Sequence, residues 1–547
     1  MPDQPWLRKY DPGVPQHLEY PAVPVFELLA QSARRYPHQV CTIYQGKKMT
    51  FRELDQLTNR LAASLVSLGV AKGEPVGLLI GNTPQFVIAF MGVLKAGGIV
   101  VAINMLYKSR EIVNQVNDAQ VQLIFAISEH YPAIKELQAG TSIRKIIVVG
   151  PVKGIPLRSK PNLSAGDAWL DDLLEQGRKL ESPHVDIQPE DTAIYQYTGG
   201  TTGTPKGALG THRNLVANVV QFRHWLVDIK DGHETVLVAI PLFHVYGMVL
   251  GMLLAIYSGA SMVLIPNPRD FQAILKSIQD YKVTIFPGVP TLYNAINNHP
   301  EVLKGRHNLS SIKACISGSA PLLTETKQRF EALTGGKLME GYGLSEAPTA
   351  THCNPMLGEN RPGSIGLPLP DVEARIVSLE DGMTVLAPGS VGELVLTGPQ
   401  VMKGYHNLPV ETRQTLREGW LYTGDIAKMD EDGYFYIVDR KKDLIKPGGY
   451  SVWPREVEEI IKQHPKVDEV CVAGVPDTYR GETVKAWVVL KPGITASEEE
   501  IRQHCQSLMA AFKVPTEVEF RSELPKTLVG KVLRRELVSQ HKQKKDQ

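Results

Sequence analysis

The stretch YTGGTTGTPKG, residues 197–207, directly follows an apolar segment at 192–198 that is predicted to be a strand. Its glycines allow backbone conformations with positive φ and a close approach of a ligand. Backbone N–H groups, threonine hydroxyls and the ammonium group of Lys206 offer many hydrogen-bond donors in a short span, which suits a polyphosphate. A flexible linker is the alternative interpretation, but linkers rarely follow a buried strand and end in Pro-Lys-Gly. The stretch therefore predicts a phosphate-binding loop.

Two common phosphate-binding motifs are excluded by the same residues. Pro205 precedes Lys206 where the loop of P-loop nucleotide hydrolases needs a glycine. The glycine spacing also differs from the G-x-G-x-x-G turn of dinucleotide-binding proteins. The loop thus belongs to another class of nucleotide site.

Apolar strand candidates and helical segments alternate on both sides of this loop. The strand candidates lie at 40–44, 75–80, 98–104, 121–127, 145–149, 192–198, 235–241, 261–266, 283–286 and 313–317. Thr50 and Glu53 have the spacing of a capping box, which predicts that a helix begins there. Continuous apolar strands between helices predict an α/β fold with layered, largely parallel sheets. The segment 155–184 lacks clear periodicity and is predicted to be irregular.

The chain has 547 residues, a length that suggests two or more domains. The pattern of predicted elements changes in its C-terminal part. Short strands at 372–377, 392–397 and 434–438 predict a β-rich subdomain. Helices at 454–463 and 497–510 and strands at 470–474 and 483–490 predict a compact α+β unit. We predict a large domain at 1–441, with the β-rich subdomain at about 350–438, and a small domain at 442–547. The basic end 541–547 is predicted to be solvated and frayed.

Composition narrows the class of protein. The net charge is +1, so the protein has no overall positive potential that would attract nucleic acid. Five cysteines without a C-x-x-C pair fit a reducing compartment, and the polar N-terminus does not read as a signal peptide. The uncharged stretch 248–265 contains glycine and serine, so we predict a buried helix, a turn and a strand. We expect a cytoplasmic protein, and leave open a peripheral contact with the inner face of a membrane and a homodimer.

Further motifs follow the loop in a fixed order. They are PLFHVYG (241–247), SGSAP (317–321), EGYGLSE (340–346), YTGD (422–425), DRKKD (439–443), LIKPGGY (444–450) and PKTLVGKV (525–532). With the loop, this set resembles the adenylate-forming superfamily of acyl-CoA synthetases, luciferases and nonribosomal peptide adenylation domains. The resemblance spans about residues 51–531. Taken alone, each motif has a plainer interpretation as a core residue, a turn or a surface charge.

The resemblance assigns an ATP/AMP-binding role to a set of residues in the first part of the chain. They are Thr198, Gly199, Gly200, Thr201, Thr202, Gly203, Thr204, Lys206, Gly318, Ser319, Gly341, Tyr342, Gly343 and Ser345. By resemblance Tyr342 stacks on adenine, and Glu346 with Thr201 holds Mg²⁺, for which a carboxylate is a fitting hard ligand. His244 matches a residue that lines the carboxylate site. Met248 stands where some long-chain members carry a tryptophan that gates the acyl tunnel. The resemblance therefore does not predict whether the tunnel of this protein is gated.

The resemblance also assigns roles in the C-terminal part. Asp425 and Arg440 match ribose or phosphate contacts, and Lys442 matches the hinge about which a mobile small domain swings. Lys446 matches a lysine of the thioester-forming state, and Gly448 and Gly449 match a turn that lines the thiol tunnel. Lys531, the leading catalytic candidate, would bridge the carboxylate and the α-phosphate, two anions that repel strongly in a dry site.

These matches imply an AMP-forming acyl-CoA synthetase that uses ATP, Mg²⁺ and CoA. The stretches 335–346, 361–366, 400–405 and 474–485 look similar to bacterial long- or medium-chain fatty acid–CoA ligases. A CoA ligase for an aromatic or short-chain acid stays open, as does an acyl-AMP ligase that serves a carrier protein. A luciferase-type oxidase would share every motif. A catalytically dead acyl- or nucleotide-binding protein is disfavoured because the charged motif residues are intact.

Overall fold

The computed structural model describes residues 4–152, 161–198, 205–447, 450, 452–477, 480–527 and 530–545. The chain forms two compact units. The large unit comprises Trp6–Glu373 and Thr397–Leu421, and the small unit comprises Met1–Pro5, Ala374–Leu396 and Tyr422–Gln547. The predicted boundary between residues 441 and 442 concerns the point about which the small domain is expected to turn. It stays a prediction.

A nine-stranded sheet forms one half of the large unit. Its order is β16 (Leu367–Pro368), β15 (Ala347–Cys353), β14 (Lys337–Leu344), β13 (Ala314–Ser317), β12 (Ile285–Gly288), β10 (Thr235–Val238), β11 (Ser261–Leu264), β1 (Val40–Tyr44) and β2 (Lys47–Thr50). The strands from β14 to β1 are parallel to their neighbours, whereas β15, β16 and β2 are antiparallel. The expected largely parallel sheet is therefore confirmed.

A seven-stranded sheet forms the other half of the large unit. Its order is β7 (Ala168–Trp169), β6 (Lys145–Val149), β5 (Leu123–Ile127), β3 (Pro75–Leu79), β4 (Ile99–Ala102), β8 (Thr192–Thr198) and β9 (Lys206–Thr211). All neighbours are parallel except β8 and β9. That antiparallel pair encloses residues 199–205, so the predicted phosphate loop connects two paired strands.

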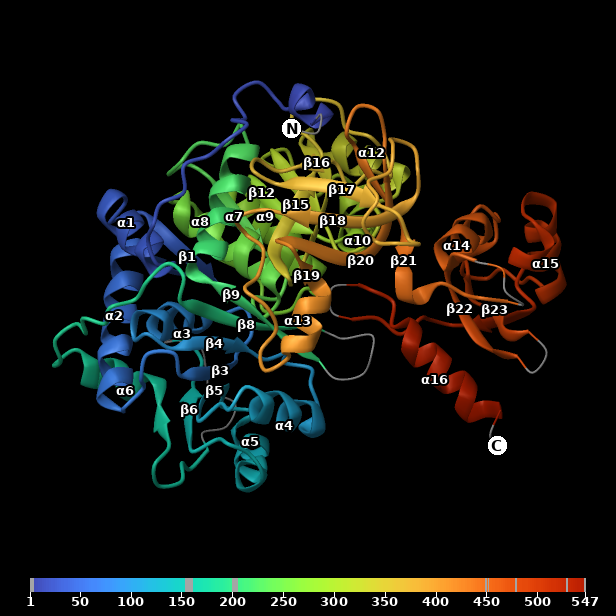
Figure 1. The fold of residues 1–547 in the computed structure, drawn as a ribbon. Coiled ribbons are helices and arrows are strands. Elements are labelled where there is room, and N and C mark those ends of the chain that lie inside the picture. The colour runs from blue at the N-terminus through green and yellow to red at the C-terminus, as the bar shows by residue number, and fades with distance from the viewer. Residues whose placement is uncertain are drawn as a thin grey trace. The chain divides into compact units, whose positions relative to one another are not determined.

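Helices cover these sheets. They are α1 (Phe26–Arg35), α2 (Phe51–Ser67), α3 (Pro84–Lys95), α4 (Ser109–Asp118), α5 (Tyr131–Leu137), α6 (Leu170–Gly177), α7 (His212–Trp225), α8 (Leu254–Tyr257), α9 (Phe271–Tyr281), α10 (Pro290–Asn297), α11 (Pro300–Leu303), α12 (Thr324–Thr334) and α13 (Pro409–Thr415). Figure 1 shows α2, α3 and α6 to one side of β3 and β4, with α4 and α5 to the other. The predicted capping box at Thr50 is confirmed, since its Oγ1 accepts from the amide of Glu53 at 3.2 Å.

The apolar stretch at 248–265 is buried in the large unit. It forms a π-helix, Gly247–Leu253, which continues into α8 and then, after a turn, into β11. The predicted buried helix, turn and strand are confirmed. Across the ranges that the structure describes, no helix combines the length and the apolar character needed to cross a membrane.

The small unit holds most of a five-stranded sheet and a separate α+β core. The first sheet runs β17 (Glu373–Val377), β18 (Gly392–Thr397), β20 (Trp420–Met429) and β19 (Leu416–Arg417), with β21 (Phe435–Arg440) also paired to β20. The second runs β22 (Val467–Asp477), β23 (Gly481–Leu490) and β24 (Glu517–Arg521). Helices α14 (Pro454–Lys462) and α15 (Glu498–Leu508) share one apolar cluster with that second sheet, and α16 (Arg534–Lys545) shares another. The expected β-rich and α+β regions are confirmed.

Two local predictions are wrong. The segment predicted to be irregular at 155–184 contains β7 and α6, because Leu170 and Leu173 turn one face of a short helix inward. The end predicted to be solvated and frayed is helical as far as Lys545 within α16; residues 542–544 are exposed as predicted, but His541 is 4% exposed. Both elements take their stability from packing on neighbours far away in the sequence, which local periodicity does not reveal.

Candidate active site

Several predicted site residues of the large unit lie where neighbouring parallel strands end. His244 follows β10, and Gly318 and Ser319 follow β13 directly. Gly341, Tyr342 and Gly343 form the last part of β14. Strands β10, β12, β13 and β14 are consecutive in the sheet, so these residues share its carboxyl edge. Open α/β sheets bind ligands at this edge.

The turn that carries His244 is held by its own backbone and by Tyr246. The Nδ1 atom of half-buried His244 accepts from the amide of Tyr246 at 3.2 Å. A neutral imidazole then carries its hydrogen on Nε2. The buried Tyr246 hydroxyl lies 3.0 Å from the carbonyl oxygen of Gly288 and 2.7 Å from that of Ile316, which ties the turn to β12 and β13. At Gly247 a Cβ atom would lie 2.4 Å from the carbonyl oxygen of Pro241, so only glycine fits.

Ser345 and Glu346 form the two-residue connection between β14 and β15, since Leu344 pairs with Ala347. Tyr342 pairs with His352 in the same hairpin, and the two ring centroids are 6.0 Å apart in an edge-on arrangement. Burial lowers the pKa of His352 to about 3, so this ring is neutral.

Two backbone features of this sheet edge are sterically demanding. A Cβ atom at Gly343 would lie 1.4 Å from the carbonyl oxygen of Thr349, so the hairpin requires glycine there. Ser319 has φ of 70°, a left-handed conformation that non-glycine residues adopt at a cost and that recurs at functional sites. Both features set the backbone path beside Tyr342.

Lys206, Tyr405 and Glu346 form a cluster in the large unit. Lys206 opens β9, and its Nζ atom lies 5.3 Å from the centroid of the Tyr405 ring. The Tyr405 hydroxyl donates to Glu346 Oε1 at 2.8 Å. The segment around Tyr405 is fixed to β9, because the amide of Leu209 donates to Gly404 and the amide of His406 donates to Gly207, each at 2.8 Å. One tyrosine thus connects the predicted phosphate lysine with the predicted metal ligand.

The centre of the predicted phosphate loop lies outside the described residues. This applies to Gly199, Gly200, Thr201, Thr202, Gly203 and Thr204, and to the side chain of Thr198. The backbone of Thr198 ends β8 and pairs with Lys206. Both ends of the loop are therefore held by one strand pair.

In the small unit, Asp425 and Arg440 are partners across β20 and β21. The Arg440 Nε atom lies 3.0 Å from Asp425 Oδ1, with side-chain exposures of 40% and 6%. The amide of Asp425 also donates to Thr423 Oγ1 at 3.1 Å. The aspartate is thus fixed by its strand and by an arginine, and its acceptor-only oxygens suit hydroxyl donors such as those of a ribose.

Lys531 lies in a hairpin of the same unit. Its amide donates to Thr527 Oγ1 at 3.1 Å, and Lys526 forms a bridge with Val532. Although Lys531 as a residue keeps exposed surface, burial of its ammonium group among protein atoms lowers its pKa to about 8. The positive charges of Arg440 and Lys442 lower this pKa further, whereas Asp425 and Asp443 oppose the shift. The small unit therefore brings Lys531 together with Asp425, Arg440 and Lys442.

Lys442 and Lys446 lie in the part of the sequence between β21 and β22. Lys442 is in a 3₁₀ turn, Lys441–Asp443, directly after β21. Lys446 is exposed, and its amide donates to Glu482 Oε2 at 3.1 Å; its described contact is thus with Glu482 and not with Lys531. Gly448 and Gly449 lie outside the described residues.

Comparison with known proteins identifies the family of this chain. The family described as AMP-binding enzyme matches residues 29–406, and the AMP-binding enzyme C-terminal domain matches residues 456–531. The chain belongs to the AMP-binding enzyme family. The resemblance to adenylate-forming enzymes is therefore confirmed, and with it the expected AMP-forming acyl-CoA synthetase that uses ATP and CoA.

Individual relatives of this AMP-binding enzyme match along nearly its whole length. The long-chain-fatty-acid–CoA ligase of Bacillus subtilis is 44% identical, with 98% of each chain covered. A ligase of the same name from Yersinia pestis is 39% identical, with 97% of each chain covered. Among solved structures, ATP-bound MatB from Rhodopseudomonas palustris has a TM-score of 0.85 at 29% identity, covering 95% of this chain and 99% of its own. The anthranilate CoA ligase AuaEII with anthranoyl-AMP has a TM-score of 0.84 at 30% identity, covering 97% and 99%.

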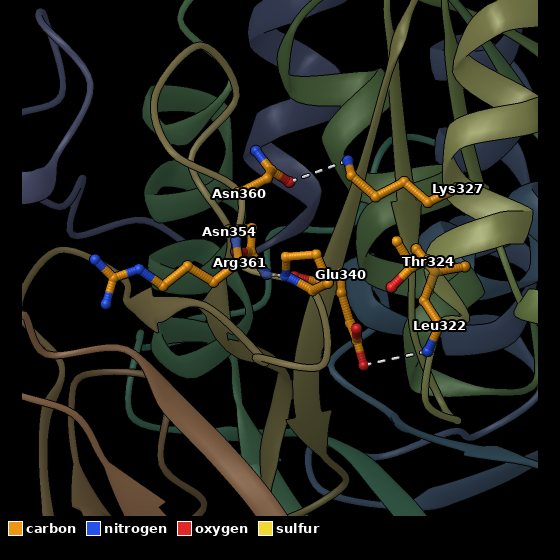
Figure 2. A pocket seen from close by; sticks show the side chains of 8 residues that line it. Leu322, Thr324, Lys327, Glu340, Asn354, Asn360 and Arg361 are labelled. Carbon is orange, nitrogen blue, oxygen red and sulfur yellow. Dashed lines mark hydrogen bonds between the residues drawn. The ribbon is translucent and has the colours of Figure 1, made fainter. Parts of the chain in front are cut away.

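A small cavity of this AMP-binding enzyme lies beside Glu340 of β14 (Figure 2). Leu322, Thr324, Lys327, Glu340, Asn354, Asn360, Arg361 and Pro362 line it. Its volume of about 10 Å³ has room for roughly one water molecule. Glu340 accepts from the amide of Leu322 at 3.3 Å, and Lys327 donates to Asn360 at 3.4 Å. The cavity is too small for a substrate and has no part in the candidate site.

Two residues escaped the sequence-based assignment. Tyr405 lies in a stretch, 400–405, that indicated a fatty acid–CoA ligase but had no individual role. Tyr246 lies two positions after His244 in the motif at 241–247, in which the resemblance assigns a role only to the histidine. The position of each tyrosine inside a motif or matched stretch is the only signal in the sequence, and it does not reveal the bonding partner, which for Tyr405 lies 59 positions away.

Proposed function

We propose that this protein activates a long-chain fatty acid with ATP and then transfers the acyl group to CoA. The observation that carries the choice of acid is the full-length similarity to the Bacillus subtilis long-chain-fatty-acid–CoA ligase. We also propose a cytoplasmic location, because all five cysteines are buried free thiols, which suit a reducing compartment.

In the first step, a carboxylate oxygen of the fatty acid attacks the α-phosphorus of ATP. A new bond forms between oxygen and phosphorus, the bond from the α-phosphorus to the bridging oxygen breaks, and pyrophosphate leaves. The ammonium group of Lys531 offsets the repulsion between the two anions, which is large in a site that excludes water. Lys206 accompanies the departing phosphates, and the Asp425 carboxylate accepts from the ribose hydroxyls.

Magnesium suits the residues on the phosphate side. The Glu346 carboxylate uses one oxygen for the Tyr405 hydroxyl and retains acceptor capacity on the other. Mg²⁺ takes oxygen ligands, usually one or two carboxylates together with substrate phosphates and water. Glu346, with Thr201 by resemblance, would hold the ion, which supplies positive charge beside the phosphates when bound.

In the second step, the CoA thiol loses its proton and attacks the acyl carbonyl carbon. A carbon–sulfur bond forms, the carbon–oxygen bond to the phosphate breaks, and AMP leaves. We propose that the small domain turns about Lys442 between the steps, which withdraws Lys531 and presents Lys446 and the turn at Gly448 and Gly449.

The test is an AMP-release assay over short-, medium- and long-chain fatty acids and aromatic acids, with and without CoA. We expect the largest CoA-dependent AMP release with long-chain acids. Highest turnover with an aromatic acid would contradict the proposed substrate, and the absence of CoA-dependent AMP with every acid would contradict the ligase function itself.

A further inference from the structure

Two carboxylates act on the charge of Lys531, and an arginine binds each of them. Asp425 and Asp443 both favour the protonated form of the lysine. The Arg440 Nε atom lies 3.0 Å from Asp425 Oδ1, and the Arg534 Nη1 atom lies 2.7 Å from Asp443 Oδ2. Arg440 already belongs to the predicted nucleotide site, whereas no role is assigned to Arg534.

Arg534 connects three elements of the small unit. It is the first residue of α16, three positions after Lys531. Its Nη1 atom reaches Asp443 at the end of the 3₁₀ turn, and its Nη2 atom lies 2.7 Å from Glu458 Oε1 on α14. Glu458 Oε1 also accepts from the amide of Val472 on β22 at 2.7 Å. The side-chain exposures of Arg534, Asp443 and Glu458 are 25%, 22% and 20%, so this is a partly buried network rather than a surface pair.

We infer that Arg534 is a positioning residue for Lys531, because it holds the Asp443 carboxylate beside the hinge and keeps it from pairing with the lysine ammonium. This inference rests on the proposed role of Lys531 in adenylation. An ion pair between a lysine and an internal carboxylate has no net charge. Such a pair cannot offset the repulsion between two substrate anions. Arg534 takes up that carboxylate and leaves the charge of Lys531 available to the substrates.

The charges around Lys531 predict that loss of the Arg534 charge and loss of the Asp443 charge shift the pKa of Lys531 in opposite directions. Lys531 faces Arg440, Lys442, Asp425 and Asp443. The groups that act on Arg534 are Glu458, Cys471 and Asp443. Without the guanidinium, the negative charge of Asp443 acts undiminished on Lys531 and raises the pKa of the lysine. Without the Asp443 charge, the pKa of the lysine falls.

The direct measurement is the pKa of the Lys531 amine in the full-length protein. Competitive acetylation with acetic anhydride over a pH series, followed by peptide mass spectrometry, reports it without any need for activity. We expect Arg534→Gln to raise this pKa by about one unit, as a nearby opposite charge does, and Arg534→Lys to raise it less. Asp443→Asn lowers it, and the double variant Arg534→Gln/Asp443→Asn returns it toward the wild-type value.

A matched control is Arg535→Gln, which removes the same charge from the next, exposed residue of α16 and leaves the pKa of Lys531 unchanged. An unchanged pKa in folded Arg534→Gln would overturn the inference. If that variant does not fold, Arg534→Lys and Asp443→Asn decide, and shifts of the same sign in both, or no shift in either, overturn it.

A second readout connects the pKa to the reaction. We expect Arg534→Gln to slow fatty-acid-dependent ATP–pyrophosphate exchange at neutral pH by up to about tenfold, because the freed Asp443 then competes with the substrate anions for the Lys531 ammonium, and to affect thioester formation from supplied acyl-adenylate much less. Equal losses in both half-reactions would indicate a merely structural role and overturn the inference. A wild-type protein without acid-dependent exchange would instead contradict the proposed function, while the labelling experiment would still judge the pairing of Arg534 with Asp443.

Discussion

The two clusters of candidate site residues are built in different ways. In the large unit, Lys206, Tyr405 and Glu346 stand on strand ends and a tight hairpin, and glycines are required where a Cβ atom would clash. In the small unit, Lys531 stands in a hairpin beside Arg440 and Lys442, and charges determine its protonation. The first cluster fixes positions, and the second sets a charge. We therefore expect the large unit to respond most to changes of shape and the small unit to changes of charge.

Removal of the Lys531 ammonium tests the role of charge in the small unit and has the largest expected effect. Lys531→Ala should reduce acid-dependent ATP–pyrophosphate exchange by about 10²–10³-fold, the usual loss when one electrostatic contact to a reacting centre is deleted. Thioester formation from supplied acyl-adenylate should stay measurable. The control Lys462→Ala removes an exposed lysine from the end of α14 and should leave both rates unchanged. Equal loss of both half-reactions in Lys531→Ala would contradict the division of roles.

The pH dependence of the same exchange reaction refines this prediction. The pKa of Lys531 is lowered to about 8, first by burial and then by Arg440 and Lys442. The protonated form predominates below that pH, so exchange should decrease as the pH rises through about 8. Lys531→Arg keeps its charge at higher pH and should abolish this decrease. An alkaline decrease that persists in Lys531→Arg would show that another group causes it.

A change of shape in the large unit has the next largest effect. In Gly343→Ala the new Cβ would lie 1.4 Å from the carbonyl oxygen of Thr349, so β14 and β15 must move apart. We expect a loss of about 1–3 kcal/mol in the free energy of unfolding, as for overpacked sites, and a higher KM for ATP. Denaturant titration and initial rates measure the two effects. The control Gly140→Ala adds a methyl group into open space at an exposed site and should be nearly neutral.

Removal of the Tyr405 hydroxyl is a smaller change in the same unit. Tyr405→Phe deletes the bond to Glu346 and keeps the ring beside Lys206. A hydrogen bond to a charged group contributes about 1.5–3 kcal/mol, so we expect roughly a tenfold loss in exchange and a requirement for more Mg²⁺. Tyr405→Leu should lose more, because it removes the ring as well. Tyr436→Phe, which deletes a tyrosine–carboxylate bond to Asp430 in the small unit, is the control; an equal effect there would contradict a specific role for Tyr405.

Much of the fold could be predicted because its signals are local. The capping box at Thr50 and Glu53, the apolar parallel strands and the buried stretch at 248–265 all depend on neighbouring residues. The helix α6 and the final helix α16 could not be predicted, since their stability comes from distant partners: Ser64 donates to the carbonyl oxygen of Leu173, and Leu537 packs near Trp487.

The candidate site shows the same division. Motif order predicted Asp425, Arg440 and Lys531, and the structure places all three in one unit. It could not predict that Tyr405 contacts Glu346, or that Arg534 binds Asp443, because those partners are separated by 59 and 91 positions. Contacts over such separations depend on how the strands and helices are arranged, and no local pattern encodes them.

A buried histidine of the large unit makes the stability of the protein sensitive to acid. His212 Nδ1 accepts from the amide of Val25 at 3.1 Å, and burial lowers the pKa of this histidine to about 4. In the unfolded chain the pKa is near 6.5, so between these two values the unfolded state binds more protons and the free energy of unfolding falls as the pH falls. The contribution is about 1.4 kcal/mol per pH unit within that window. His212→Gln should therefore reduce the slope of stability against pH between pH 6.5 and 4 in urea titrations, whatever its effect at neutral pH. An unchanged slope in His212→Gln would show that the large unit owes its acid sensitivity to other groups.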